Sequence, residues 1–355
     1  MPGSDRRFET AIPVHLQTAR SRHKRVSESY RPPHPSFSAR FDPKILQVAM
    51  AYFGIQYKEW TSAVDTALAH LSASFDGPDG PGHWDRASYV DEMEFVNIVV
   101  VAYWDVRERF ERWLNATENR RWWEDGARLS DGIGYFREIY LPRSEDSETI
   151  FSHTDKEGVS VLARSMSGEV QEHGYWGSAR DRIPLSQVDA LEARGSAEAI
   201  VDANSSGRRI RIRPHQNLCI IRSGQDWGET DEAERRMYFE DVEPHLTAGM
   251  RFLRDEGRAI GCYSNRFVRM TDRTGQPIAK TYSVSLWREL SDLERWAESH
   301  PTHLAIFVAA IRYFSELGLT AGLRLYHEVS VVRAEDQSFE YVNCHESTGM
   351  LAAVP

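Results

Sequence analysis

The sequence has few cysteines and no long apolar segment. Its three cysteines, Cys219, Cys262 and Cys344, are an odd number at scattered positions. They therefore predict no disulfide framework and are typical of a reducing compartment. The longest apolar run covers residues 95–104, which is far shorter than the roughly 20 residues that span a bilayer. Because the N-terminal residues also lack the apolar stretch of a signal peptide, we expect a soluble, cytoplasmic protein that binds no membrane.

Several familiar catalytic motifs are absent as well. The sequence contains no P-loop, no G-x-S-x-G elbow, no H-E-x-x-H motif and no pair of C-x-x-C motifs. Its nearest approach to a dinucleotide-binding fingerprint, Gly132-Ile133-Gly134, lacks the third glycine. The absence of C-x-x-C-H excludes covalent attachment of a c-type haem. These absences argue against nucleotide-binding enzymes, zinc proteases and α/β-hydrolases.

The composition is that of a folded protein with an acidic surface. Of the 355 residues, 41% are hydrophobic and 11% are aromatic, which is enough for a large buried core. The 43 basic and 53 acidic residues give a net charge of −10, which argues against a nucleic-acid partner. The length allows two domains or one large fold built from two halves.

The first 40 residues differ from the remainder of the chain. They hold eight basic and three acidic residues and include the stiff sequence RPPHP at 31–35. We interpret residues 1–40 as an extended arm that packs on the protein surface or on a second subunit, although an anionic partner would also suit its charge. Residues 41–160 and 161–355 are then interpreted as two halves of one compact unit.

Apolar runs and helical spacings alternate irregularly, which favours an α+β fold over a doubly wound sheet. Pro244 predicts a break or kink in the longest helical stretch. The predicted strands cover residues 49–57, 95–104, 134–140, 209–221, 262–270, 281–287 and 323–332. The predicted helices cover residues 61–74, 106–114, 231–254, 292–299 and 302–317.

One short pattern occurs twice in the chain. Trp104 ends a predicted strand and is followed by Glu-Arg-Trp at 111–113, while Trp287 ends another and is followed by Glu-Arg-Trp at 294–296. The spacing between the strand-ending tryptophan and Glu-Arg-Trp is the same in both copies. This repeat predicts two related halves that form an antiparallel sheet, or barrel, flanked by helices.

One histidine begins an otherwise apolar helical face. His303 lies at helical spacing from Ile306 and Ala310. A single proximal haem ligand requires an imidazole held in this way, but a hydrogen-bonded core histidine produces the same pattern. His300 completes an H-x-x-H pair, which without a third ligand is a weak metal signal.

Three further segments place polar groups beside apolar strands. Alternation puts His327 on the same face as Val329, which we expect to be the inner face of the sheet. Arg180 and Arg182 lie two residues apart and could bind carboxylates, and Ser223 ends a predicted strand. A structural histidine, a surface ion-pair loop and a serine at a strand end explain these patterns equally well.

Together the segments resemble those of the bacterial aldoxime dehydratases, haem b enzymes that convert aldoximes into nitriles. The resemblance implies a lyase with ferrous haem in its active state, an aldoxime substrate, a homodimer and a ferredoxin-like dimeric α/β-barrel with haem between sheet and helix. The segments that carry the resemblance are GYFREIYLPR, EHGYWGSARDR, IIRSGQDW, GCYSNRFVR, ERWAESHPTHL, LRLYHEVSV and YVNCHESTGM, in this order.

The resemblance also assigns roles to single residues. His303, in SHPTH, corresponds to the haem-iron ligand, and His327, in LYHE, to the distal general acid and base. Ser223 corresponds to the residue that hydrogen-bonds the oxime. Arg182 and Glu148 correspond to the distal arginine and a nearby glutamate. A peroxidase or chlorite-dismutase-like haem enzyme and a non-catalytic haem sensor remain as alternatives.

Overall fold

The computed structural model describes residues 8–201 and 208–354, and most strands in them belong to a single 12-stranded sheet. All neighbouring strands of this sheet are antiparallel. The strands are, in spatial order, β6 (Ser147–Phe151), β13 (Arg324–Val332), β10 (Leu218–Asp226), β12 (Pro277–Trp287), β11 (Cys262–Thr271), β3 (His83–Val90), β4 (Val96–Trp104), β2 (Ala49–Tyr57), β5 (Gly134–Tyr140), β14 (Gln337–Val342), β9 (Arg209–Arg213) and β8 (Glu198–Val201).

The sheet contains one strand arrangement twice. The order β13-β10-β12-β11 repeats the order β5-β2-β4-β3, and the two sets join where β11 pairs with β3. Each set is extended by a strand from the other part of the chain, because β6 follows β5 but pairs with β13, and β14 follows β13 but pairs with β5. The exchange is accompanied by reciprocal ion pairs, Arg143–Asp336 at 3.3 Å and Arg333–Asp146 at 3.2 Å.

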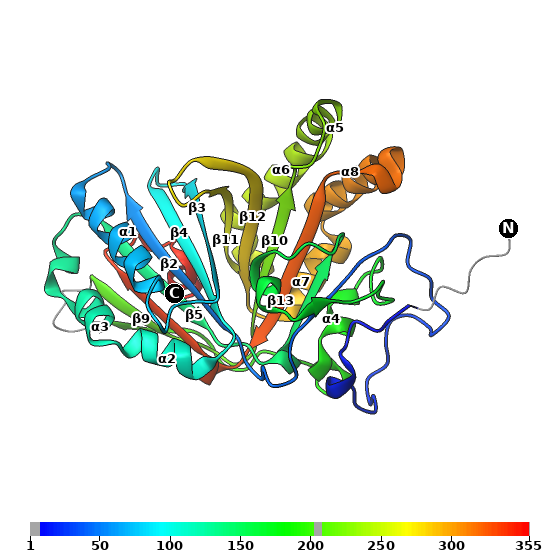
Figure 1. Ribbon diagram of the computed structural model, residues 1–355, viewed down its shortest axis with the longest axis horizontal. Helices are drawn as coiled ribbons and strands as arrows, with labels where there is room; N and C mark the ends of the chain where they lie inside the picture. Colours follow the sequence, from blue (N-terminus) through cyan, green and yellow to red (C-terminus); the bar gives the residue numbers. More distant parts are fainter. Residues whose placement is uncertain (1–7, 202–207, 355) are drawn as a thin grey trace.

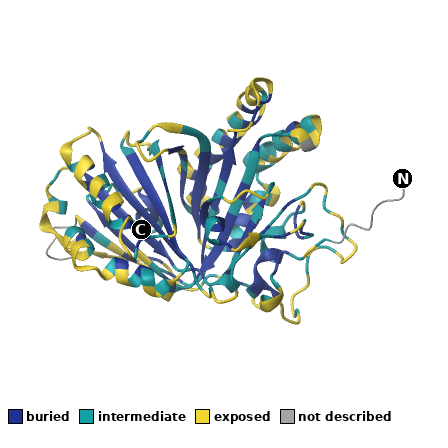
Figure 2. Cartoon of the chain, in the orientation of Figure 1, coloured by how far each residue is buried: buried dark blue, intermediate teal, exposed yellow. Residues whose placement is uncertain are grey.

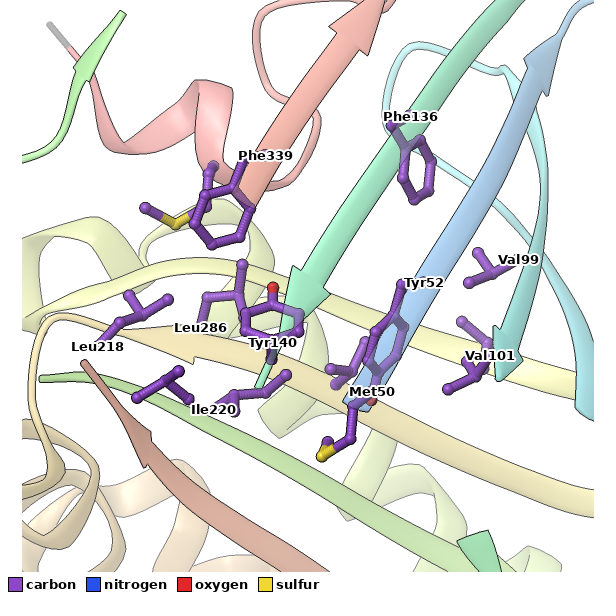
Figure 3. Close-up of a cluster of buried hydrophobic side chains, with 14 of the residues drawn as sticks. Met50, Tyr52, Val99, Val101, Phe136, Tyr140, Leu218, Ile220, Leu286 and Phe339 are labelled. Carbon is purple, nitrogen blue, oxygen red and sulfur yellow. The ribbon is translucent and has the colours of Figure 1, made fainter. Parts of the chain in front are cut away.

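The main core fills the space between the two sets of strands. Side chains from both sets meet there, among them Tyr52, Tyr140, Leu218 and Phe339, each at most 2% exposed (Figure 3). Strands with both faces covered are apolar along their whole length, and all nine residues of β2 are buried. The core therefore holds the two sets together as one unit.

Helices cover the outer faces of the two sets (Figure 1). Figure 2 shows exposed residues mainly on the helices and loops, whereas the strands are largely buried. The helices over β2, β4 and β5 are α1 (Ser62–Phe75), α2 (Arg107–Asn115) and α3 (Thr117–Glu124). The helices of the other set are α5 (Glu232–Met237), α6 (Glu243–Asp255), α7 (Leu290–Ser299) and α8 (Pro301–Leu317). No helix in residues 8–201 and 208–354 is long and apolar enough to cross a membrane.

Most predicted elements are confirmed within a few residues, and the break at Pro244 is confirmed too. A π-helical segment, Tyr238–Val242, separates α5 from α6. The single strand predicted at 209–221 is wrong, because this run forms two strands, β9 and β10, in distant parts of the sheet. Strands β3, β6, β8 and β14 were not predicted, since their exposed or charged residues interrupt the apolar alternation.

Candidate functional site

Ser223 and His327 lie directly opposite each other on neighbouring strands. In the register of β10 and β13, Ser223 pairs with His327 and the next pair is Arg222 with Glu328. Val329, two residues beyond His327, packs in the cluster formed with α6 and α7. The prediction that His327 lies on the inner face of the sheet is therefore wrong. Ser223 and His327 face the helices, whereas Arg222 and Glu328 point into the space between the two strand sets.

Arg182 and Glu148 complete a cluster around His327. Glu148 lies on β6 opposite Val329, and Arg182 is the last residue of α4 (Ser178–Arg182). The Nε and Nη2 atoms of Arg182 donate to the two carboxylate oxygens of Glu148 at 2.6 and 3.0 Å. The Nε2 atom of His327 lies 2.9 Å from Arg182 Nη2 and 3.2 Å from Glu148 Oε1. The structure thus brings together Glu148, Arg182, Ser223 and His327.

The electrostatics of this cluster keep Glu148 ionised. Burial alone would raise the pKa of the Glu148 carboxyl, but the charge of Arg182 and the contact with His327 outweigh it and hold this pKa below its usual value. The side chains of Glu148 and Arg182 are 1% and 2% exposed, whereas His327 is 31% exposed. With a proton on Nε2, His327 can donate a hydrogen bond to Glu148, both as the imidazolium and as the neutral tautomer whose Nδ1 is free to accept a proton. The cluster therefore suits both protonation states of this imidazole.

His303 lies on α8, near this cluster. Its ring is held edge-on by Trp296, with ring centroids 4.7 Å apart, and by Trp176 at 5.7 Å. Burial lowers its pKa to about 4, which the backbone of Ala297 partly opposes, and the nearby His327 lowers it further. The two imidazoles are therefore close enough for the charge of one to act on the other.

The surroundings of His303 fit a haem-iron ligand. Its low pKa keeps the imidazole neutral near pH 7, and only a neutral imidazole can coordinate a metal. Its Nδ1 atom is buried, and the backbone of Ala297 is the group that acts to raise its pKa. A metal-bound imidazole normally directs its second nitrogen to such a carbonyl. His303 on α8 and the polar cluster on the strands therefore form a candidate haem site.

A buried polar network lies directly behind Ser223 and His327, and sequence reasoning missed it. Arg222 donates to Asp85 at 2.9 Å and to the hydroxyl of Tyr103 at 2.5 Å. Glu328 accepts a hydrogen bond from the backbone of Val159 at 2.7 Å, and burial raises its pKa to about 7. Strand alternation offered a signal, because it places two charged residues on a fully buried face. We expect this network to fix the register of β10 and β13.

Comparisons with known proteins identify the family of this chain. Residues 51–350 match the family model of the haem-containing dehydratases. The chain is 45% identical over 347 residues to an aliphatic aldoxime dehydratase of Rhodococcus erythropolis, covering 97% of this chain and 98% of that protein. It is 34% identical to a phenylacetaldoxime dehydratase of a Bacillus species, covering 92% of this chain and 94% of the relative.

Solved structures give the same result. A crystal structure of an aldoxime dehydratase in complex with butyraldoxime matches this chain with a TM-score of 0.93 and 45% identity. The match covers 98% of this chain and 97% of that one. The match extends over both strand sets and the helices, so the shared architecture is that of the whole molecule. This chain therefore belongs to the family of haem-containing dehydratases that includes the aldoxime dehydratases.

Proposed function

We propose that this protein is a lyase that converts aldoximes into nitriles, R–CH=N–OH giving R–C≡N and water, with haem b as its cofactor. Family membership supports both the reaction and the cofactor. The observation that carries the proposal is the arrangement of the site. His303, whose low pKa keeps its imidazole neutral, lies close to a cluster in which His327 contacts both a buried arginine and a buried carboxylate.

His303 would hold the haem iron, with the haem between α8 and the strands β10 and β13. Ferrous haem bound there would supply electron density that weakens the N–O bond of an oxime bound through nitrogen. Trp296 and Trp176 would fix the ring of His303 from two sides. A ring fixed in this way presents one nitrogen to the metal in a constant direction.

His327 would move both protons of the reaction. Its Nε2 atom is engaged by Arg182 and Glu148, so Nδ1 is the nitrogen left to meet the oxime. The protonated imidazole would give its proton to the departing hydroxyl, which leaves as water. The neutral imidazole would then take the proton from the oxime carbon, which restores the starting state. Glu148 would stabilise the protonated form through its negative charge.

Ser223 and Arg182 would orient the hydroxyl of the substrate. Ser223 is the strand partner of His327, so its hydroxyl and the imidazole are presented to the same region of the pocket. A hydrogen bond that fixes the oxime oxygen before the reaction lowers the entropic part of the barrier. Arg182, fixed by Glu148, would stabilise negative charge that develops on this oxygen.

We further propose that the two strand sets are ferredoxin-like halves. Each set has the order fourth, first, third, second, with helices on one side, which is the arrangement of a β-α-β-β-α-β unit. The proposed division of the chain is an arm at 1–40, a first half at 41–160 and a second half at 161–355. We also propose that the protein is a cytoplasmic homodimer, as the resemblance implies.

Nitrile formation tests the proposed function directly. Purified holoprotein, reduced with dithionite, is incubated with butyraldoxime and with phenylacetaldoxime, and nitriles are measured by gas chromatography. We expect nitrile from at least one substrate, and none when the same protein lacks haem. Fully haem-loaded protein that forms no nitrile from either class would overturn the proposal, and peroxide-dependent dye oxidation in that sample would favour the peroxidase alternative.

A further inference from the structure

The N-terminal arm packs against the segment that carries Arg182. Residues 8–40 run beside α4 and the loop before it (Figure 1). The backbone of Glu9 bonds to residues 169 and 171, and the backbone of Ser21 and Arg22 bonds to Gln187. The arm thus holds the segment 169–187 from both ends. The arm therefore packs on the same chain whose candidate site contains Arg182.

Glu172 is the main attachment point between this arm and the segment. Its carboxylate accepts a hydrogen bond from the backbone of Ala11 at 2.8 Å and from the hydroxyl of Thr10 at 3.0 Å. It also pairs with Lys24 at 3.3 Å, and the residue is 1% exposed. A buried carboxylate with three donors from one segment is a strong and specific attachment.

The same residue touches the guanidinium of Arg182. The backbone carbonyl of Glu172 accepts a hydrogen bond from Arg182 Nη1 at 2.7 Å. The remaining nitrogens of this guanidinium contact Glu148 and His327. The guanidinium is planar and rigid, so a shift at Nη1 rotates the hydrogen bonds of Nε and Nη2 as well. Two residues, Glu172 and Arg182, therefore connect the arm to His327.

A second attachment acts on the neighbouring residue. The carboxylate of Asp181 accepts from the backbone of Arg25 at 3.0 Å, and its carbonyl accepts from Arg20 at 3.0 Å. The hydroxyl of Tyr175 binds the same carboxylate at 2.8 Å. Since α4 has only five residues, it has little stability of its own. External attachments must hold it in place.

The arm also lines a cavity behind the cluster. This cavity of about 70 Å³ is lined by Ala11 and Leu16 of the arm, by Glu148 and Arg182 of the cluster, and by Ser147 and Ser330. Without the arm, the buried pair of Arg182 and Glu148 would face water on this side. Exposure to water weakens an ion pair and loosens the hydrogen bonds that orient its partners.

We propose that the N-terminal arm is part of the active site, and that Glu172 is a positioning residue that transmits the position of the arm to Arg182. This inference rests on the proposed function, because it assigns to Arg182 a role in that reaction. The arm makes no contact with substrate in this account. It fixes the direction of a guanidinium that does.

The test is a double-mutant cycle on the haem-loaded enzyme. Glu172→Gln keeps the size of the side chain but removes the negative charge that pairs with Lys24. It also replaces one of the two carboxylate oxygens that accept hydrogen bonds from Ala11 and Thr10. We expect kcat to fall about 10-fold, with haem content unchanged. In the Arg182→Ala background, Glu172→Gln should cause no further loss, because the residue acts through Arg182. The milder Thr10→Val should lower kcat a few-fold in the same dependent manner if Glu172→Gln does not fold.

Glu298→Gln is the matched control. Glu298 pairs with Arg25 of the arm at 3.1 Å, and both side chains are about half exposed. Its loss removes a side-chain contact of the arm but leaves every contact of Glu172 and the backbone hydrogen bond of Arg25 to Asp181 in place, so kcat should stay within twofold of the unmutated enzyme. Full activity in Glu172→Gln, or an equal loss with and without Arg182, would overturn the inference.

A readout independent of turnover separates this inference from the proposed function. The C–O stretching frequency of the ferrous carbonyl complex responds to charges and donors beside the bound gas. We expect Glu172→Gln to shift it in the same direction as Arg182→Ala, and Glu298→Gln to leave it unchanged. If the unmutated protein forms no nitrile, the proposed function fails while this measurement still decides the inference. A shift with Arg182→Ala but none with Glu172→Gln would overturn it.

Discussion

The two strand sets share one arrangement but differ in what lies between strands and helices. Trp104 contacts Trp113 with ring centroids 5.1 Å apart, and Trp287 contacts Trp296 at 5.7 Å. The residues of these two pairs belong to the repeated sequence pattern, and in each set they pack a helix against the end of a strand. The packing of helix on strand is therefore the same in both sets at the tryptophan pairs. The side chains differ a few residues further along the strands.

Equivalent positions carry different side chains. Ala49 pairs with Trp104 and Cys219 with Trp287, and four residues further along the strands are Phe53 and Ser223. Their partners on the next strand are Arg137 and His327. The ring of Phe53 packs against Trp113 at 5.3 Å and against Phe75 at 6.0 Å. Where the first set has an aromatic core, the second has a short hydroxyl and an imidazole.

Helix α8, which carries His303, is loosely packed. Tyr313 is its single buried residue, whereas α1 and α6, which hold the same position in the two sets, bury four residues each. A cavity of about 30 Å³, lined in part by Phe53 and Trp113, lies beneath the helices of the first set. The first set is thus packed with aromatic side chains where the second set has Ser223 and His327.

The largest effect is expected at the iron ligand. His303→Ala removes the imidazole from α8, and the described residues contain no group of three or more histidine, cysteine, aspartate or glutamate side chains that could hold a metal ion instead. We expect loss of haem from the purified protein, measured as Soret absorbance per chain. A variant that keeps its full Soret band would contradict the assignment of His303.

The distal histidine should behave in the opposite way. His327→Ala leaves the iron ligand intact, so haem should be retained at the unmutated level. Loss of a general acid and base typically lowers the rate about 10²–10⁴-fold, and kcat should fall within this range. Equal loss of haem in this variant and in His303→Ala would contradict the separate roles of His303 in binding the iron and of His327 in moving protons.

The first set should affect stability and not chemistry. Phe53 is 5% exposed and packs in the aromatic core, so Phe53→Ala should lower the free energy of unfolding by about 3–5 kcal/mol. The activity per bound haem should stay unchanged below the unfolding temperature. Urea unfolding and a rate normalised to haem measure both quantities. A large loss of normalised activity would mean that the first set also shapes the site.

The buried pair of Glu148 and Arg182 should make stability depend on pH. Glu148 has a pKa below its unfolded value of 4.5, so its ionised form stabilises the fold above pH 4.5 and this contribution is lost as the pH falls through the folded value. Glu148→Gln leaves Arg182 without its carboxylate and should cost about 3 kcal/mol at neutral pH. The difference in Tm should narrow below pH 4.5. A constant difference from pH 7 to pH 4 would contradict this sign.

The smallest effect is expected at Ser223. Ser223→Ala removes one hydrogen bond to the substrate, worth about 0.5–1.5 kcal/mol, so kcat/KM should fall up to about 10-fold with haem content unchanged. Ser223→Phe introduces the side chain of the equivalent Phe53 and should block the pocket more severely than the alanine variant. Substrate kinetics on both variants compare the two effects. Unchanged kinetics in Ser223→Ala would remove this residue from the site.

The sequence predicts the strands and helices well where local pattern decides them. The runs that became β2, β5 and α1 are long, apolar and periodic, and the structure reproduces them almost residue for residue. The run at 209–221 was misjudged because two strands of similar composition follow each other without a strong turn signal. The exchange of β6 and β14 between the sets was not predictable, since pairing partners far apart in sequence leave no local pattern.

The sequence pointed to the residues of the candidate site but not to their geometry. The resemblance implies roles for Glu148, Arg182, Ser223, His303 and His327, which stay predictions. In the structure Glu148, Arg182 and Ser223 lie beside His327, whose charge also acts on His303. Alternation alone assigned His327 to the wrong face, because a strand covered on both sides gives no polar face to distinguish them. The link from the arm through Glu172 depends on contacts across some 160 residues, which no local pattern records.

The most direct test is an absorption titration of reduced His327→Ala with butyraldoxime. We propose that His303 holds the haem iron, that the oxime can bind without His327, and that His327 is needed to move protons. We therefore expect a saturable shift of the Soret band with almost no nitrile formed. No shift at any concentration, or nitrile formed at the unmutated rate, would contradict it.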